Sequence, residues 1–338
     1  MKTIEIKAEN TKVLFKALTD QLNGTLNVKL KEYELVFDNH LGKGMVRGTQ
    51  IPNNITFLQF DAEFNEDVKL ILQSPKRSVI NFLYCNQGKL SHSFGLKNPE
   101  TVLETFQTGI SSNISTNQNN LRFFKDSRVN SVLISVNTLS DDNRNCKVTK
   151  MLHNTFIKDK EEDYLYLGSY NLKITNHVKQ LNALKQEGIV RKLLIDGLVN
   201  LILALEVDQH KNDIENPQSS VATLTASEME DIKELSDYIN NYPETNIGVN
   251  EWCAKIGLSP AKVQEGFKAM HGKTINEYVR YVRLTKSEEL LKTTDLNISE
   301  IVYTLGLTSR SYFSHIFKDM YNCSPSEYKK KNRLAATA

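Results

Sequence analysis

The feature that most constrains the fold is an internal repeat in the last third of the 338-residue chain. Residues 259–268 align with residues 309–318 at an offset of 309 minus 259, or 50 residues. The same offset pairs identical residues: Phe267 with Phe317, Lys268 with Lys318, Met270 with Met320, Glu277 with Glu327, and Tyr278 with Tyr328. A repeat constrains the fold more than a single motif does, because each copy must form the same small structure.

Each copy carries the signals for two short helices and a turn. Gly257 ends the first helix, because glycine accepts the left-handed backbone needed there. Ser259 is a suitable cap for the next helix, and Pro260 occupies its first position, where no amide donor is missed. In the second copy, Asn297 caps a helix and Gly306 turns the chain. Each copy therefore predicts a helix-turn-helix unit.

A long helix is predicted between the two units. Thr274 and Glu277 form a capping box at its start, and the apolar spacing continues to about Leu291. Such a rigid connecting helix would fix the two units relative to each other, so that they bind together as one rigid body. Cys253 falls where a small residue lets two helices approach, so we expect it to pack in the core and not to act as a nucleophile.

The second copy carries a run of residues that resembles a known signature. The run is Ser309-x-Ser311-Tyr312-Phe313-Ser314-x-x-Phe317-Lys318, followed by Ser324-Pro325-x-x-Tyr328. It resembles the AraC/XylS family of bacterial transcription regulators, and the resemblance covers Leu224 to about Lys331. Two positions depart from the family pattern: Asn322 stands where Gly is usual, and Lys262 stands where an aromatic residue is common. The resemblance implies a sequence-specific DNA-binding transcription regulator, with double-stranded DNA and RNA polymerase as partners and with activation as the commoner outcome.

The second helix of each unit is expected to enter the major groove with its outward, N-terminal positions near the bases. The expected DNA-binding residues are Ser259, Ala261, Lys262, Gln264, Glu265 and Lys268 in the first unit, and Ser309, Arg310, Ser311, Ser314, His315 and Lys318 in the second. The alternative for several of these positions is a merely solvated helix face. Two units on one connector imply two adjacent major grooves about one helical turn, or ~34 Å, apart.

These residues differ in the role expected of each. Arg310 and His315 suit guanine, and Gln264 suits adenine. Lys268 and Lys318 suit phosphate, which sets affinity and its dependence on salt. Because the first unit carries an acidic residue and few arginines, it is predicted to discriminate less between sequences than the second unit.

The first 160 residues have the pattern of many short strands separated by turns. Asn23-Gly24 is a hairpin signal, and apolar residues alternate or cluster within residues 27–37, 55–64 and 79–84. This pattern favours a sandwich or a small barrel. The family resemblance implies a cupin-like β barrel over residues 1–160 that senses a small molecule. The predicted fold class is therefore α+β, with the barrel and its following helices preceding an all-α domain of two helix-turn-helix units joined by a long helix.

Residues 161–210 are predicted to form a helical dimerisation segment. From Thr175 onward the apolar residues recur at three and four positions, and the second helix is apolar over much of its circumference. Two compatible interpretations remain: this segment covers its own barrel, or it also pairs with a second copy in a homodimer. The expected dimerisation residues are Val178, Leu181, Leu184, Leu194, Leu198, Leu201 and Leu205. Residues 211–226 are expected to be a linker, followed by the DNA-binding domain at residues 227–333.

Composition excludes several other classes. The net charge is +2, with one dense basic cluster at Lys329, Lys330, Lys331 and Arg333. None of the four cysteines lies in a CxxC pair, so neither zinc nor a disulfide framework is expected, and a cytoplasmic location is predicted. Residues 1–10 lack an apolar core, so no signal peptide is expected, and the most apolar stretch, residues 189–207, is predicted to be too charged to span a membrane. No cofactor is expected.

Three rival functions compete with regulation by a small molecule. A cupin metalloenzyme would need clustered ligands, whereas His40, His92 and His153 are isolated. A DNA-repair alkyl-transfer protein would need a reactive thiolate, and neither Cys85 nor Cys146 has a base beside it in the sequence. The chain is therefore predicted not to be an enzyme. The third rival stays open: a DNA-binding regulator without an effector, whose first domain serves only dimerisation or protein partners.

Overall fold

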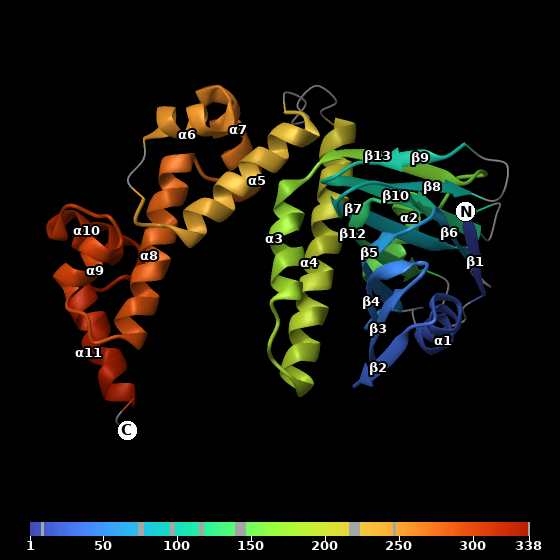
Figure 1. The fold of residues 1–338 in the computed structure, drawn as a ribbon, viewed down its shortest axis with the longest axis horizontal. Coiled ribbons are helices and arrows are strands. Elements are labelled where there is room, and N and C mark those ends of the chain that lie inside the picture. Colours follow the sequence, from blue (N-terminus) through green and yellow to red (C-terminus); the bar gives the residue numbers. More distant parts are fainter. Residues whose placement is uncertain are drawn as a thin grey trace. The chain divides into compact units, whose positions relative to one another are not determined.

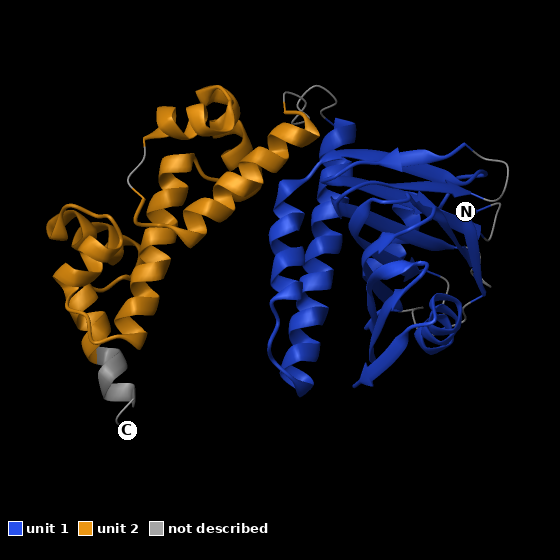
Figure 2. Cartoon of the chain, viewed as in Figure 1, with its two compact units in different colours: residues 1–222 blue, residues 223–338 orange. Residues whose placement is uncertain are grey.

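A computed structural model of the chain describes residues 1–7, 10–73, 78–94, 99–114, 118–138, 147–215, 224–245 and 248–336, and the side chains up to residue 330. It has two compact units, residues 1–222 and 223–338 (Figures 1 and 2). The first is rich in β-sheet and the second is helical, so the predicted α+β class is confirmed.

The first compact unit contains two sheets. The strands are β1 (Lys2–Lys7), β2 (Thr25–Lys29), β3 (Glu32–Asn39), β4 (Gly42–Ile51), β5 (Ile55–Phe64), β6 (Val68–Gln73), β7 (Val79–Gln87), β8 (Leu90–Phe94), β9 (Thr101–Leu103), β10 (Gln107–Ser112), β11 (Gln118–Phe123), β12 (Arg128–Asn137) and β13 (Tyr164–Tyr170). One sheet has the order β1-β6-β11-β8-β9 and the other β13-β10-β7-β12-β5-β4-β3-β2. Neither sheet closes on itself among the described residues, so the expected cupin-like barrel is not confirmed.

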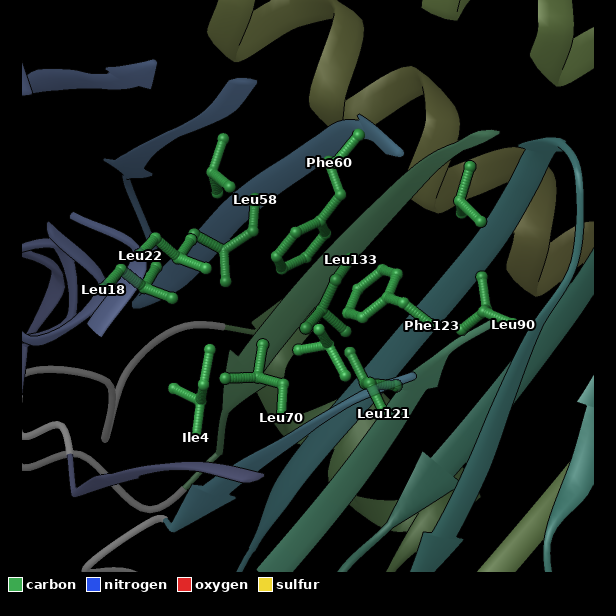
Figure 3. Close-up of a cluster of buried hydrophobic side chains, with 14 of the residues drawn as sticks. Ile4, Leu18, Leu22, Leu58, Phe60, Leu70, Leu90, Leu121, Phe123 and Leu133 are labelled. Carbon is green, nitrogen blue, oxygen red and sulfur yellow. The ribbon is translucent and has the colours of Figure 1, made fainter. Parts of the chain in front are cut away.

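The two sheets enclose the core of this compact unit (Figure 3). Leu58, Phe60 and Leu133 of the large sheet face Leu121 and Phe123 of the small sheet, because alternate residues of a strand point to the same side. The rings of Phe60 and Phe123 lie 5.2 Å apart. Helix α1 (Thr11–Leu22) closes one side of the core with its buried leucines.

Three helices follow the strands of the first compact unit: α2 (Lys147–Phe156), α3 (Leu172–Asn182) and α4 (Gly188–Glu215). On β7, Phe82 meets Phe156 of α2 edge to face at 5.6 Å, and the Tyr84 hydroxyl lies 2.7 Å from Thr175 Oγ1 of α3. These contacts place helices against the face of the large sheet that points away from the core. Helices α2 and α3 therefore cover their own sheet, and α4 has a buried face at Ile195, Val199, Ile202 and Leu203 as well as an exposed one.

Helix α4 extends beyond residue 210, the predicted end of the helical segment, and includes residues 211–215 of the expected linker. Asp213 accounts for this difference. Its carboxylate accepts hydrogen bonds from the Ser169 backbone amide at 2.9 Å and from the Ser169 hydroxyl at 2.8 Å, which fixes the last turns of α4 to β13. Residues 216–223 of the expected linker lie outside the described residues.

The second compact unit contains helices α5 (Ala226–Asn241), α6 (Val249–Ile256), α7 (Pro260–His271), α8 (Ile275–Thr293), α9 (Ile298–Thr304), α10 (Arg310–Tyr321) and α11 (Pro325–Ala336). Helices α6 and α7 form one helix-turn-helix, α9 and α10 form the other, and α8 joins them (Figure 1). The predicted capping is confirmed at Ser259, which accepts from the Lys262 amide, and at Gly257, which has a left-handed backbone. Asn322, which stands where Gly is usual, also has a left-handed backbone. In the part of the chain that the structure describes, no helix is long and apolar enough to cross a membrane.

Candidate nucleic-acid interface

Helix α10 presents a polar face whose side chains are almost all exposed. Phe313, Ile316 and Phe317 are buried, and they hold the helix against the core of the second helix-turn-helix. The predicted contact residues lie on the other faces: Ser309, Arg310, Ser311, His315 and Lys318 are exposed, and Ser314 is half-buried. The spacing of three and four residues between core positions leaves these residues outward.

Two further features of α10 refine this face. Tyr312, which is not among the predicted contacts, has half of its side chain exposed. It occupies the third position of the helix, so the helical period alone places it beside the predicted contacts. The His315 Nδ1 atom lies 2.9 Å from a carboxylate oxygen of Asp319, one turn further along. Arg310 has no ion pair with any described residue.

Helix α7 presents a different face, although it occupies the matching place in the first helix-turn-helix. Ser259, Ala261 and Lys268 are exposed, whereas Lys262, Gln264 and Glu265 are half-buried. Lys262 contacts α5, and Gln264 contacts the start of α8. Two of these side chains are therefore already engaged inside the domain.

The engaged side chains are those of Lys262 and Gln264. The ammonium nitrogen of Lys262 lies 2.5 Å from a carboxylate oxygen of Glu228 in α5, and this ion pair lowers the pKa of Glu228. The Gln264 side-chain carbonyl accepts from the Ile275 backbone amide at the start of α8, at 3.3 Å. Neither contact was visible in the sequence, because each joins residues from different helices.

The expected dimerisation residues divide into two groups. Val178 and Leu181 are buried within the first compact unit, so their side chains are not on its surface. Leu194 and Leu201 are exposed on α4, and Leu184, Leu198 and Leu205 are half-buried. Four exposed apolar residues of α4 were not in the predicted set: Ile189, Val190, Leu193 and Ile214, the first of which is 68% exposed.

The residues that the rival functions would need are structurally ordinary. Cys85 is buried, and burial raises the pKa of its thiol to about 12, which keeps it protonated. Cys253 is buried in the first helix-turn-helix, as predicted, and Cys146 lies outside the described residues. His92 is also buried and bonds to the Asn119 amide oxygen at 3.0 Å. Among the described residues, no three His, Cys, Asp or Glu side chains are grouped to hold a metal ion.

Comparison with known proteins identifies a family model whose match lies within the helical unit. A family model described as a helix-turn-helix domain matches residues 252–331. The xylose operon regulatory protein of Escherichia coli strain K12 is 34% identical over 95 residues, which are 28% of this chain and 24% of that protein. The transcriptional activator RhaR of Salmonella dublin is 27% identical over 167 residues, or 48% of this chain and 56% of that protein. The chain thus spans about a quarter and about half of these two relatives.

Among solved structures, the DNA-binding domain of the transcriptional factor AdpA in complex with a target DNA is similar to this chain. The identity is 18%, and the match covers 31% of this chain and 94% of that domain with a TM-score of 0.30.

Proposed function

We propose that this chain, whose C-terminal helical unit belongs to the AraC/XylS family, is a sequence-specific DNA-binding transcription regulator. One observation carries the proposal: the helix-turn-helix occurs twice on one connecting helix, and α10 exposes a polar face with an arginine at its N-terminus that has no ion pair among the described residues. Two such helices on one connector match adjacent major grooves about one helical turn, or ~34 Å, apart.

The side chains of α10 then divide by role. Arg310 and His315 read guanine edges, because a guanidinium and an imidazole can donate to the guanine acceptors in the major groove. Lys318 and Lys268 contact phosphates, which fixes the position of the protein and makes binding sensitive to salt. The exposed first turns at Ser259 and Ser309 can offer backbone amides to phosphates as well.

The first helix-turn-helix discriminates less between sequences than the second. Lys262 is held by Glu228, and the Gln264 carbonyl is occupied by α8, so neither side chain is as free as those of α10. Glu265 adds a negative charge to the same helix, which disfavours close approach to phosphates.

The first compact unit is proposed to be a cupin-like sensor that binds a small molecule and shifts the population able to occupy two half-sites. Activation through RNA polymerase, and a cytoplasmic location, belong to the same proposal. The name of RhaR, a transcriptional activator, supports activation as the outcome. The proposed sensor, dimerisation and DNA-binding segments are residues 1–160, 161–210 and 227–333. Of the expected linker at residues 211–226, residues 211–215 belong to α4.

The alternative is a regulator without an effector, whose first compact unit serves only dimerisation or protein partners. The exposed apolar face of α4, made by Ile189, Val190, Leu193, Leu194 and Leu201, favours a second copy of the chain as that partner. Such a face on a surface helix is typical of a protein interface. A homodimer is compatible with both versions of the proposal.

The test is a genomic DNA pull-down with the purified full-length chain, followed by sequencing of the bound fragments. We expect a recurrent site with two short blocks one helical turn apart, and we expect the site to disappear with the Arg310→Ala/His315→Ala variant. Salt-sensitive binding with no recurrent sequence would contradict sequence-specific regulation.

A further inference from the structure

The structural repeat extends beyond the two helix-turn-helix units to the helices that support them. At the first helix-turn-helix, Ser236 and Asn240 of α5 hold the hydroxyl of Tyr278, at 3.1 and 2.6 Å. At the second, Glu288 of α8 holds the hydroxyl of Tyr328 at 2.5 Å. Tyr278 and Tyr328 are matching residues of the sequence repeat. Helix α8 therefore supports the second helix-turn-helix as α5 supports the first.

This match fixes the offset between the two supporting helices. Ser236 corresponds to Glu288, a difference of 288 minus 236, or 52 residues. The same offset pairs Ile232 of α5 with Leu284 of α8. Ile232 lies against Gly266 of α7, and Leu284 is buried in one cluster with Ile316, the residue of α10 that matches Gly266. One helical turn before Ile232 and Leu284, the same offset of 52 residues pairs Glu228 of α5 with Arg280 of α8.

At the first of these matching positions, a positive charge is neutralised. Glu228 uses one carboxylate oxygen for the ammonium group of Lys262, at 2.5 Å, and the other for the Thr225 backbone amide at the start of α5, at 2.9 Å. The carboxylate is therefore fixed by the helix that it caps. The Lys262 ammonium group is tied to it, and the pair has no net charge.

At the second matching position, a positive charge has no ion pair among the described residues, although it contributes, after the bonds from Thr274, to the lowered pKa of Glu277. Arg280 is exposed, and no described carboxylate lies within 4.0 Å of its guanidinium group. The acidic residue one turn before it, Glu277, accepts from the Thr274 backbone amide at 2.8 Å and from the Thr274 hydroxyl at 2.8 Å. The position in α10 that matches Lys262 is 262 plus 50, which is the half-exposed Tyr312.

We propose that Arg280 binds a DNA phosphate beside the groove that α10 enters, and that Glu228 withholds Lys262 from the phosphate at the matching place of the first helix-turn-helix. The two helix-turn-helix units then contribute unequally to the electrostatic part of binding, because a supporting helix adds a cation in one and neutralises a cation in the other. This inference rests on the proposed DNA binding and adds a contact residue outside both recognition helices.

The test measures the equilibrium affinity of the full-length chain for a duplex recovered in the pull-down, over a series of potassium chloride concentrations. Each phosphate contact contributes about 0.9 to the slope of log affinity against log salt. We expect Arg280→Gln to reduce the magnitude of the slope by about 0.9, because one phosphate contact is lost. We expect Glu228→Gln to increase that magnitude by about 0.9, because Gln can still cap α5 while the Lys262 ammonium group becomes available to a phosphate. Lys262→Gln is expected to leave the slope unchanged, and Glu228→Gln/Lys262→Gln to restore the wild-type slope.

Two exposed residues of the supporting helices provide matched controls. Lys286→Gln removes a cation of α8 that is paired with Glu289 at 2.8 Å, and Glu234→Gln removes an anion from α5; both are expected to keep the wild-type slope. The inference would be overturned if Arg280→Gln left the slope unchanged, or if the single variant Lys262→Gln reduced the magnitude of the slope. In either case the proposed function would still stand. Failure of the wild-type chain to bind any duplex would instead overturn the proposed function itself.

Discussion

A Cβ atom on Gly306 would lie 2.2 Å from the carbonyl oxygen of Glu244. Gly306 is the turn glycine of the second helix-turn-helix, whereas Glu244 follows α5, which supports the first. Arg283 of α8 holds the same segment, since its guanidinium group donates to the carbonyl oxygens of Pro243 at 2.8 Å and Thr245 at 3.1 Å. The turn of the second helix-turn-helix is therefore fitted directly against backbone that precedes the first, which supports the expectation that both bind as one object.

This contact predicts that the two turn glycines differ in their tolerance of a side chain. Both have left-handed backbones, with φ of 66° at Gly306 and 69° at Gly257, but nothing lies within 4 Å of a Cβ atom on Gly257. Gly257→Ala is expected to cost about 1 to 2 kcal/mol of unfolding free energy from backbone strain alone. Gly306→Ala is expected to cost clearly more, because backbone must also move. Fluorescence of Trp252, the single tryptophan, reports unfolding of the helical unit in denaturant. Equal losses would contradict the close fit.

Arg310→Ala is predicted to reduce discrimination at one base pair of the site. The exposed guanidinium group has no ion pair with a described residue. Its removal should therefore weaken the free energy of binding to the preferred duplex by roughly 1–3 kcal/mol and have little effect on binding to a duplex altered at that base pair. Binding to both duplexes, measured by fluorescence anisotropy, checks this. Lys318→Ala is the matched comparison and should weaken both duplexes alike. The same uniform loss in Arg310→Ala would assign that residue to phosphate.

Charge on the exposed face of α4 is predicted to separate a dimer. Leu194→Lys/Leu201→Lys introduces two cations on the apolar surface and should change a dimer into a monomer in sedimentation of the full-length chain. Val28→Lys, an apolar-to-charged change at an exposed position of β2, should leave the association state unchanged. A wild-type chain that sediments as a monomer at all concentrations would remove the dimer from the proposal.

Glu206 predicts a pH dependence for the first compact unit. This residue of α4 is fully buried, neither carboxylate oxygen has a hydrogen-bond partner among the described residues, and burial raises its pKa well above the ordinary value. The folded state therefore prefers the protonated form, so its stability falls as pH rises from about 4.5 towards the raised pKa. Above the raised pKa the loss of stability is complete. It amounts to about 1.4 kcal/mol for each pH unit between the pKa of Glu206 in the unfolded chain and its pKa in the folded chain.

Glu206→Gln keeps the side chain neutral, so it should stabilise the first compact unit at pH 8 and have a much smaller effect near pH 4. Calorimetry of the full chain measures this effect. A parallel fluorescence melt identifies the relevant transition as the one in which Trp252 fluorescence does not change, because Trp252 belongs to the second compact unit. Glu215→Gln, at an exposed position of the same helix, is the control and should be neutral at both pH values. A stabilisation of equal size at pH 4 and pH 8 would show that ionisation of Glu206 is not its cause.

The sequence by itself determined the architecture of the second compact unit. Turn glycines, capping serines and threonines, and the apolar spacing of α10 are local signals, and each acts within about one helical turn. Because the signals occurred twice at a constant offset, the two helix-turn-helix units and the outward face at Arg310 and Lys318 could be predicted. The strand-rich character of the first compact unit was also predictable from alternation, whereas the closed barrel expected from resemblance was not confirmed.

Only the tertiary structure decided which of the predicted side chains are free. Lys262 and Glu228 are 34 residues apart, and Val178 and Leu181, which were expected at a dimer interface, are buried within the first compact unit. A helical period shows that a residue lies on one face, but not what covers that face. The meeting of Lys262 with Glu228, and of Gly306 with Glu244, depends on how whole helices pack, which no local pattern of residues specifies.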